Sequence, residues 1–153
     1  MRLLQFFYIT LIIVGMTIIS CKSVKDDCSI ESENNFMKLK VYYKKVDDNY
    51  IKFILKAERL QLKENEYLPN SENFRVEIYD NENSLIFNSD FEKNYLMVIG
   101  DVQPKEKGQT TDYEYTWDKK NNYSKAVPKG KYRAKLIIPA APEIYSITID
   151  FEV

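Results

Sequence analysis

From residue 36 onward, apolar and polar residues alternate in short runs that are separated by turn-forming residues. A period of two is typical of a strand with one buried face, because successive side chains of a strand point to opposite sides. The clearest alternating runs are residues 37–43, 51–57, 74–78, 113–117, 132–138 and 145–153. No stretch has the spacing of a helix of three turns. The pattern therefore predicts a domain built from strands.

Two of the breaks between runs carry residues that favour tight turns. Asp47-Asp48-Asn49 follows the first run, and Asp80-Asn81-Glu82-Asn83 separates residues 74–78 from a short apolar return at 85–87. Asp and Asn side chains favour turns because they hydrogen-bond to the backbone two residues further on. Each pair of runs is therefore predicted to form an antiparallel hairpin.

One apolar run does not alternate. Residues 95–99 read Tyr-Leu-Met-Val-Ile and stop at Gly100. Such a run is typical of a strand that is buried on both faces. With it, the 118 residues from 36 to 153 hold seven or eight short strands. This number and spacing predict an all-β fold, an immunoglobulin-like antiparallel β-sandwich.

The first 21 residues differ from the rest. Arg2 is their only charged residue, and residues 3–19 are apolar with few interruptions. A basic start, a short apolar run and a small-residue boundary are typical of an export signal. The run of about 17 residues is short for a membrane-spanning helix, which needs roughly 20.

The end of this segment, Ile18-Ile19-Ser20-Cys21, resembles the lipobox of bacterial lipoproteins. The resemblance implies that residues 1–20 are a signal peptide cleaved before Cys21, and that Cys21 is acylated on its sulfur and its new amine. Two or more acyl chains hold a protein stably on a membrane. The alternatives are an uncleaved anchor helix and an ordinary signal with a coincidental cysteine. The expected location is the bacterial cell envelope, periplasmic or surface-exposed.

Residues 21–35 are expected to be the lipidated cysteine and a flexible tether, because 22–35 are polar and offer almost nothing to bury. The folded domain is then expected to span 36–153. Cys28 lies in the polar stretch and is the one other cysteine of the chain. It is either an incidental thiol or a functional one.

Composition excludes several kinds of chemistry. The 153 residues contain no histidine, which removes Ser-His-Asp and Cys-His catalysis and histidine metal sites. Two cysteines are too few for a four-cysteine metal centre, and four glycines offer no phosphate-binding loop. The near balance of 22 basic and 23 acidic residues does not favour nucleic-acid binding. We expect no catalysis, no cofactor, no metal site and no nucleic-acid partner.

The second half of the chain resembles a known family at several segments. They are the strand and aspartate at 74–80, the turn and return at 83–89, Tyr95, Val102-Gln103-Pro104, Tyr115-Thr116-Trp117 and the Pro-x-Gly-x-Tyr step at 128–132. In this order they resemble the intracellular proteinase inhibitor (BsuPI) domain family, closely over 72–153 and loosely over 36–60. The resemblance implies an immunoglobulin-like sandwich and makes proteinase inhibition a candidate activity. The chain departs from the family at 104–108, where the family has Pro-Gly.

Two aromatic residues are candidates for a binding role. Trp117 is flanked at period two by Tyr113 and Tyr115, which places it most naturally between the sheets. The alternative is that Trp117 and Tyr115 stack on a ligand such as a sugar ring. In the Pro-x-Gly-x-Tyr step, Gly130 is expected to supply backbone freedom, and the Tyr132 hydroxyl is expected to cap a turn.

Three functions from different classes remain. The first is a membrane-anchored, non-catalytic lipoprotein whose sandwich binds another protein or has an envelope role. The second is proteinase inhibition, with loop 101–112 or loop 119–127 held as a rigid substrate mimic. The third is a carbohydrate-binding module that uses Trp117 and Tyr115.

Overall fold

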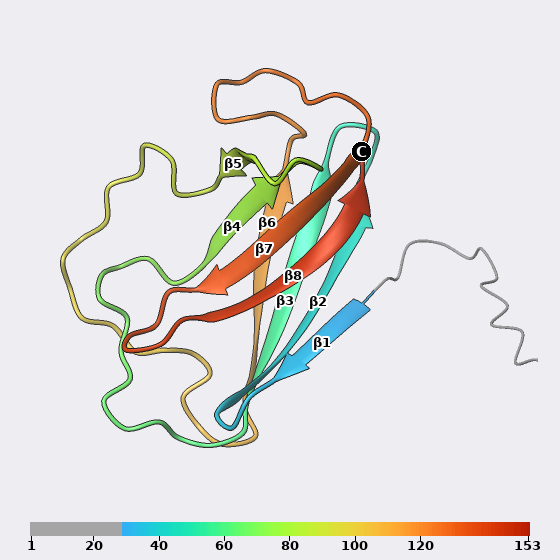
Figure 1. Ribbon diagram of the computed structural model, residues 1–153. Coiled ribbons are helices and arrows are strands. Elements are labelled where there is room, and N and C mark those ends of the chain that lie inside the picture. The colour runs from blue at the N-terminus through green and yellow to red at the C-terminus, as the bar shows by residue number, and fades with distance from the viewer. Residues whose placement is uncertain (1–28) are drawn as a thin grey trace, which may run out of the picture.

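A computed structural model describes residues 29–153 (Figure 1). Within this part of the chain there are eight strands and no helix: β1 (Ser29–Glu33), β2 (Met37–Lys45), β3 (Ile51–Arg59), β4 (Arg75–Tyr79), β5 (Leu85–Asn88), β6 (Thr110–Trp117), β7 (Lys131–Ile138) and β8 (Tyr145–Glu152). They form two four-stranded sheets, ordered β1-β2-β3-β6 and β5-β4-β7-β8, and every pairing is antiparallel. The predicted antiparallel β-sandwich is confirmed.

Apart from β1, the chain path is immunoglobulin-like. The β2–β3 hairpin lies in one sheet, the chain crosses to the other for β4 and β5, returns for β6, and crosses again for β7 and β8. Tyr132, near the start of β7, donates its hydroxyl to the Pro128 carbonyl at 2.7 Å. This is the tyrosine corner of such domains, so the expected cap is confirmed. Gly130 has no positive φ, which among the glycines of residues 29–153 occurs at Gly108, so its expected freedom is not used.

The core lies between the sheets. Every second residue of β2 from Met37 to Tyr43 is buried, and β8 buries alternate residues in the same way. Trp117 is 1% exposed and packs against the rings of Phe87, Tyr132 and Phe151, with centroids 5.9–6.4 Å apart. Its Nε1 donates to the Lys120 carbonyl at 2.7 Å. Trp117 therefore occupies the interior position.

Strand β1 corrects the predicted boundary between tether and domain. Residues 29–33 were expected to be tether, but they pair along β2 from Ser29 opposite Tyr42 to Glu33 opposite Lys38. All five side chains are exposed, so no alternation of burial marks this strand in the sequence. Backbone pairing holds it, together with ion pairs from Glu31 to Lys38 and Lys40. The strand-paired part of the chain therefore begins no later than Ser29.

The apolar run at 95–99 is not a strand, so that prediction is wrong. It lies in the connection between β5 and β6, and the side chains of residues 96–99 are exposed. In this topology the chain between β5 and β6 must cross from one sheet to the other, around the end of the sandwich. Residues 95–99 lie on that crossing and pair with neither sheet as a strand.

The strands run between two ends of the sandwich, which carry different connections (Figure 1). We call "loop end" the end with the β3–β4, β5–β6 and β7–β8 connections, residues 60–74, 89–109 and 139–144. We call "hairpin end" the opposite end, with the turns at 46–50 and 80–84, the β6–β7 connection at 118–130 and the C-terminus. Between residues 29 and 153, no helix has the length and apolarity needed to span a membrane.

Candidate functional site

Exposed apolar side chains gather in the connections of the loop end. Leu96, Met97 and Ile99 are 71%, 88% and 79% exposed, and Val98 between them is also exposed. The other connections of this end add Leu62, Tyr67 and Ile144. Single exposed apolar residues are ordinary, but four in sequence are not, and grouped exposed apolar side chains are typical of an interaction site. We call residues 96–99 the apolar segment.

Backbone hydrogen bonds fix the apolar segment at both ends. At its start, Leu96 donates its N–H to the Ser71 hydroxyl at 2.9 Å and accepts from the Ser71 N–H at 3.0 Å. Just after it, Gly100 and Leu68 exchange two backbone hydrogen bonds of 2.8 and 3.0 Å. Inside the segment, the Val98 N–H donates to the Leu96 carbonyl at 2.9 Å, which closes a three-residue turn with Met97 at its tip.

A buried arginine holds the loop end from inside. Arg59, the last residue of β3, donates from Nε to the Pro104 carbonyl at 2.8 Å and from Nη2 to Glu66 at 2.6 Å. Glu66 also accepts the hydroxyl of Tyr145 at the start of β8. Burial, with this hydrogen bond, raises the pKa of Tyr145 above its usual range. One charged cluster thus joins two strands to two of the three connections.

A second arginine holds the same connections from the side of β4. Arg75 donates from Nε and Nη2 to the two carboxylate oxygens of Glu72 at 2.7 and 2.6 Å. Its Nη2 also lies 3.5 Å from Asp90, which follows β5. The hydrogen bonds to Glu72 raise the pKa of the Arg75 guanidinium. Bidentate pairs of this kind fix geometry as well as charge, so the apolar segment is presented on a preorganised support.

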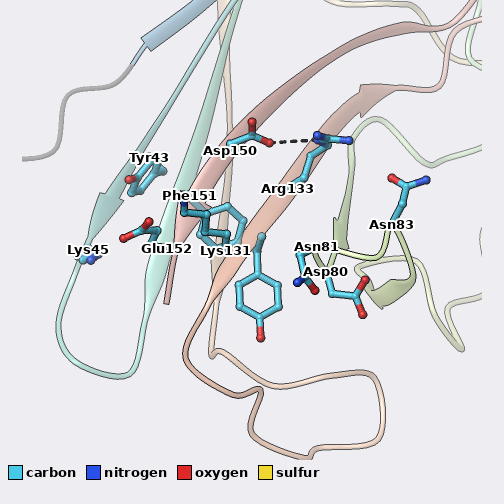
Figure 2. Close-up of a pocket in the computed structure, with 11 residues that line it drawn as sticks. Tyr43, Lys45, Asp80, Asn81, Asn83, Lys131, Arg133, Asp150, Phe151 and Glu152 are labelled. Carbon is cyan, nitrogen blue, oxygen red and sulfur yellow. Dashed lines mark hydrogen bonds and ion pairs between the residues drawn. The ribbon is translucent and has the colours of Figure 1, made fainter.

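A hollow of about 570 Å³ opens at the hairpin end (Figure 2). It is lined by residues of β2, β7, β8 and the β4–β5 turn: Tyr43, Lys45, Asp80, Asn81, Asn83, Lys131, Tyr132, Arg133, Asp150, Phe151 and Glu152. Arg133 and Asp150 pair across β7 and β8 at 3.1 Å, and Asn81 and Asn83 lie on the side of the β4–β5 turn. Lys131 forms no ion pair within residues 29–153, so the hollow keeps an open cation.

The residues singled out in the sequence lie in different places. Trp117 is buried and presents no ring face to a ligand, so the predicted stacking role is not supported for it. Tyr115 is half-buried and packs on Phe87 with centroids 5.8 Å apart, and burial raises its pKa. Cys21 and Cys28 lie outside the described residues. Among residues 29–153, no three His, Cys, Asp or Glu side chains are grouped to hold a metal ion.

The two loops considered for proteinase inhibition, 101–112 and 119–127, lie at opposite ends of the sandwich. Residues 110–112 of the first belong to β6, and the second, 119–127, lies at the hairpin end, closed by a bridge between Lys120 and Ala126. The fixed apolar segment lies in neither. Sequence reasoning also missed Arg59, although Ile51, Phe53, Leu55 and Ala57 place it on the core-facing register of β3. An arginine at that position was the available signal for a buried ion pair.

Comparison with models of known protein families gives no match, and comparison with curated proteins gives none either.

Proposed function

We propose that the protein is a membrane-anchored, non-catalytic lipoprotein of the bacterial cell envelope, whose sandwich binds a protein partner through the apolar segment. The observation that carries the proposal is the exposure of four consecutive aliphatic side chains on a loop fixed at both ends. Interfaces draw most of their affinity from a few apolar anchors that enter pockets of the partner. A support that is already rigid loses little conformational entropy on binding.

The connections that support the apolar segment are held in a fixed geometry, which favours a role in binding. Two arginine clusters hold the connections in place: the pair of Arg59 and Glu66 is buried on both sides, whereas Arg75 is partly exposed and pairs with the buried Glu72. Charged side chains are almost never fully buried unless they are paired, so each of these residues depends on its partner for its position. Met97, at the tip of the three-residue turn, is the side chain best placed to act as an anchor.

The membrane anchor rests on the sequence Ile18-Ile19-Ser20-Cys21. Globomycin, which blocks the lipoprotein signal peptidase, should cause an unprocessed precursor to accumulate. Mass spectrometry of the mature chain should then place acyl groups on Cys21. A chain with unchanged mobility under globomycin and an unmodified Cys21 would remove the lipoprotein assignment.

Proteinase inhibition, implied by the family resemblance, is one specific form of such binding. A loop held at both ends suits a rigid substrate mimic, and the apolar segment meets that condition. A panel of serine proteases should be assayed with the protein and with Met97→Asp. Inhibition that the variant loses would support this form, and uniform inactivity at micromolar protein would end it. Carbohydrate binding, the alternative function, loses its main support because Trp117 is buried.

Photo-crosslinking in cells tests the binding proposal directly. A photoreactive amino acid placed at position 97 or 99 should give one discrete protein adduct, because both side chains project into solvent. Position 56 serves as the matched control, since Lys56 is an exposed residue of β3. Identical adducts from all three positions, or none from 97 and 99, would contradict the proposal.

A further inference from the structure

The β6–β7 connection at the hairpin end is strongly basic. The connection and the first residue of β7, residues 118–131, contain a single acid, Asp118, and five lysines: Lys119, Lys120, Lys125, Lys129 and Lys131. The same connection carries Tyr123, whose side chain is 74% exposed. The chain as a whole has 22 basic and 23 acidic residues, so this concentration of one charge is local.

Within the described part of the chain, two of these lysines have polar partners and three form no ion pair. Lys119 donates to the Asp48 carbonyl at 2.6 Å, and Lys120 pairs with Asp118 at 3.1 Å. The side chains of Lys125, Lys129 and Lys131 form no ion pair within residues 29–153. Lys131 also lines the hollow of Figure 2, together with Lys45 and the acidic residues Asp80, Asp150 and Glu152. These three lysines can therefore bind a ligand of opposite charge without breaking an ion pair within the described residues.

Hydrogen bonds within the connection fix its shape. The Asn121 side chain accepts the N–H groups of Tyr123 and Lys125, both at 3.0 Å. Asn122 bonds in both directions to the backbone of Asn88, at 2.8 Å each. The lysines thus project from a structured loop.

The way the chain joins the fold places this basic connection near the proposed anchor. Ser29 pairs with Tyr42, close to the hairpin end of β2, and β1 then runs toward the loop end. The residues between Cys21 and Ser29 are 22–28. The eight steps from Cys21 to Ser29, at roughly 3.3–3.6 Å each, reach about 29 Å at most. The hairpin end is therefore the end that such a short connection keeps next to the membrane.

We propose that the β6–β7 connection docks on anionic phospholipid headgroups of the membrane that holds the anchor. Lys125, Lys129 and Lys131 meet the lipid phosphates, and Tyr123 lies at the headgroup level, where tyrosine is favoured. This seats the hairpin end on the bilayer and turns the apolar segment of the loop end away from it. The inference rests on the proposed membrane anchor.

The test uses the full chain in bilayers, with a fluorescent amino acid at position 123 and a quencher on the lipid headgroups. Emission should be quenched in bilayers of equal parts phosphatidylcholine and phosphatidylglycerol, and much less in phosphatidylcholine alone. Lys125→Glu with Lys129→Glu should lower the contacting population by about fivefold for each lysine, and raised salt should also lower it. A probe at position 97 should remain unquenched.

Lys56→Glu with Lys107→Glu is the control, since it makes the same charge change on β3 and at the loop end. Three outcomes would overturn the inference. They are equal quenching in both bilayers, the same loss of quenching in the control variant as in the Lys125→Glu, Lys129→Glu variant, and stronger quenching at position 97 than at position 123. Acylation of Cys21 is read separately by mass. An unacylated chain that still shows lipid-dependent quenching would refute the anchor and leave the headgroup contact standing.

Discussion

Arg59 and Glu66 form an ion pair in which both side chains are buried, with exposures of 2% and 7% and an Nη2–Oε2 distance of 2.6 Å. Arg59 closes β3, whereas Glu66 lies in the β3–β4 connection. The Arg59 guanidinium also lies over the Tyr145 ring, with Cζ 5.9 Å from the ring centroid. The pair thus joins the core to the loop that supports the apolar segment.

Removal of one partner should therefore destabilise the whole domain. Arg59→Met leaves the Glu66 carboxylate buried without its counter-charge, at an expected cost of about 3–5 kcal/mol in the free energy of unfolding. Arg59→Met combined with Glu66→Gln should recover part of this loss, because the amide oxygen still accepts the Tyr145 hydroxyl. Urea unfolding measures both. A single variant within about 1 kcal/mol of the parent would show that the pair does not hold the loop end.

Trp117 should act as a core residue. Trp117→Ala should lower the free energy of unfolding by about 3–5 kcal/mol, since it opens a cavity among Phe87, Tyr132 and Phe151. Tyr123→Ala is the exposed control and should change stability by no more than about 0.5 kcal/mol. A stable Trp117→Ala protein with a selective loss of sugar binding would instead restore the stacking role.

Met97 and Val102 lie five residues apart and should respond in opposite ways to a charge. Met97→Asp changes a side chain that is already in water, so the melting temperature should stay close to that of the parent. Val102→Asp places a carboxylate in the core cluster without a partner and should destabilise the domain by several kcal/mol. Thermal unfolding followed by circular dichroism distinguishes them. A similar fall in the melting temperature of both variants would mean that the apolar segment packs against the domain.

Alkaline pH should lower the free energy of unfolding of the domain. Burial raises the pKa of Tyr79, Tyr95 and Tyr113 to about 12, with hydrogen bonds to Glu77 and Asp90 adding to the effect for the first two. The folded chain then keeps protons that the unfolded chain releases near pH 10.0, so this stability is complete below that pH. It is lost as the pH rises through about 12.

Urea unfolding at increasing pH measures this loss, and tyrosinate absorbance reports the ionisation itself. Tyr113→Phe should reduce the dependence of stability on pH, because that ring no longer titrates, although its hydrogen bond to the Gln103 carbonyl at 2.9 Å is also removed. Ionisation of all tyrosines in one step near pH 10.0, with the chain still folded, would contradict the assigned shifts.

Local patterns in the sequence determined much of the fold. The alternating runs correspond to β2, β3, β4, β6, β7 and β8, because a strand with one buried face needs apolar residues at every second position. Asp80 accepts the N–H groups of Glu82 and Ser84, so the predicted turn follows from side-chain chemistry alone. The tyrosine corner at Tyr132 was equally local.

Tertiary structure decided what depends on partners distant in the chain. Residues 95–99 have the composition of a buried strand, and the crossing between sheets leaves them exposed. β1 has no apolar alternation. It pairs with the free edge of β2, where Glu31 forms ion pairs with Lys40, its partner in the register, and with Lys38 two residues away. Arg59 becomes part of a cluster when Glu66, Pro104 and Tyr145 converge on it. Burial and ion pairing are properties of the assembled sandwich, whereas alternation and turn chemistry are read within a few residues.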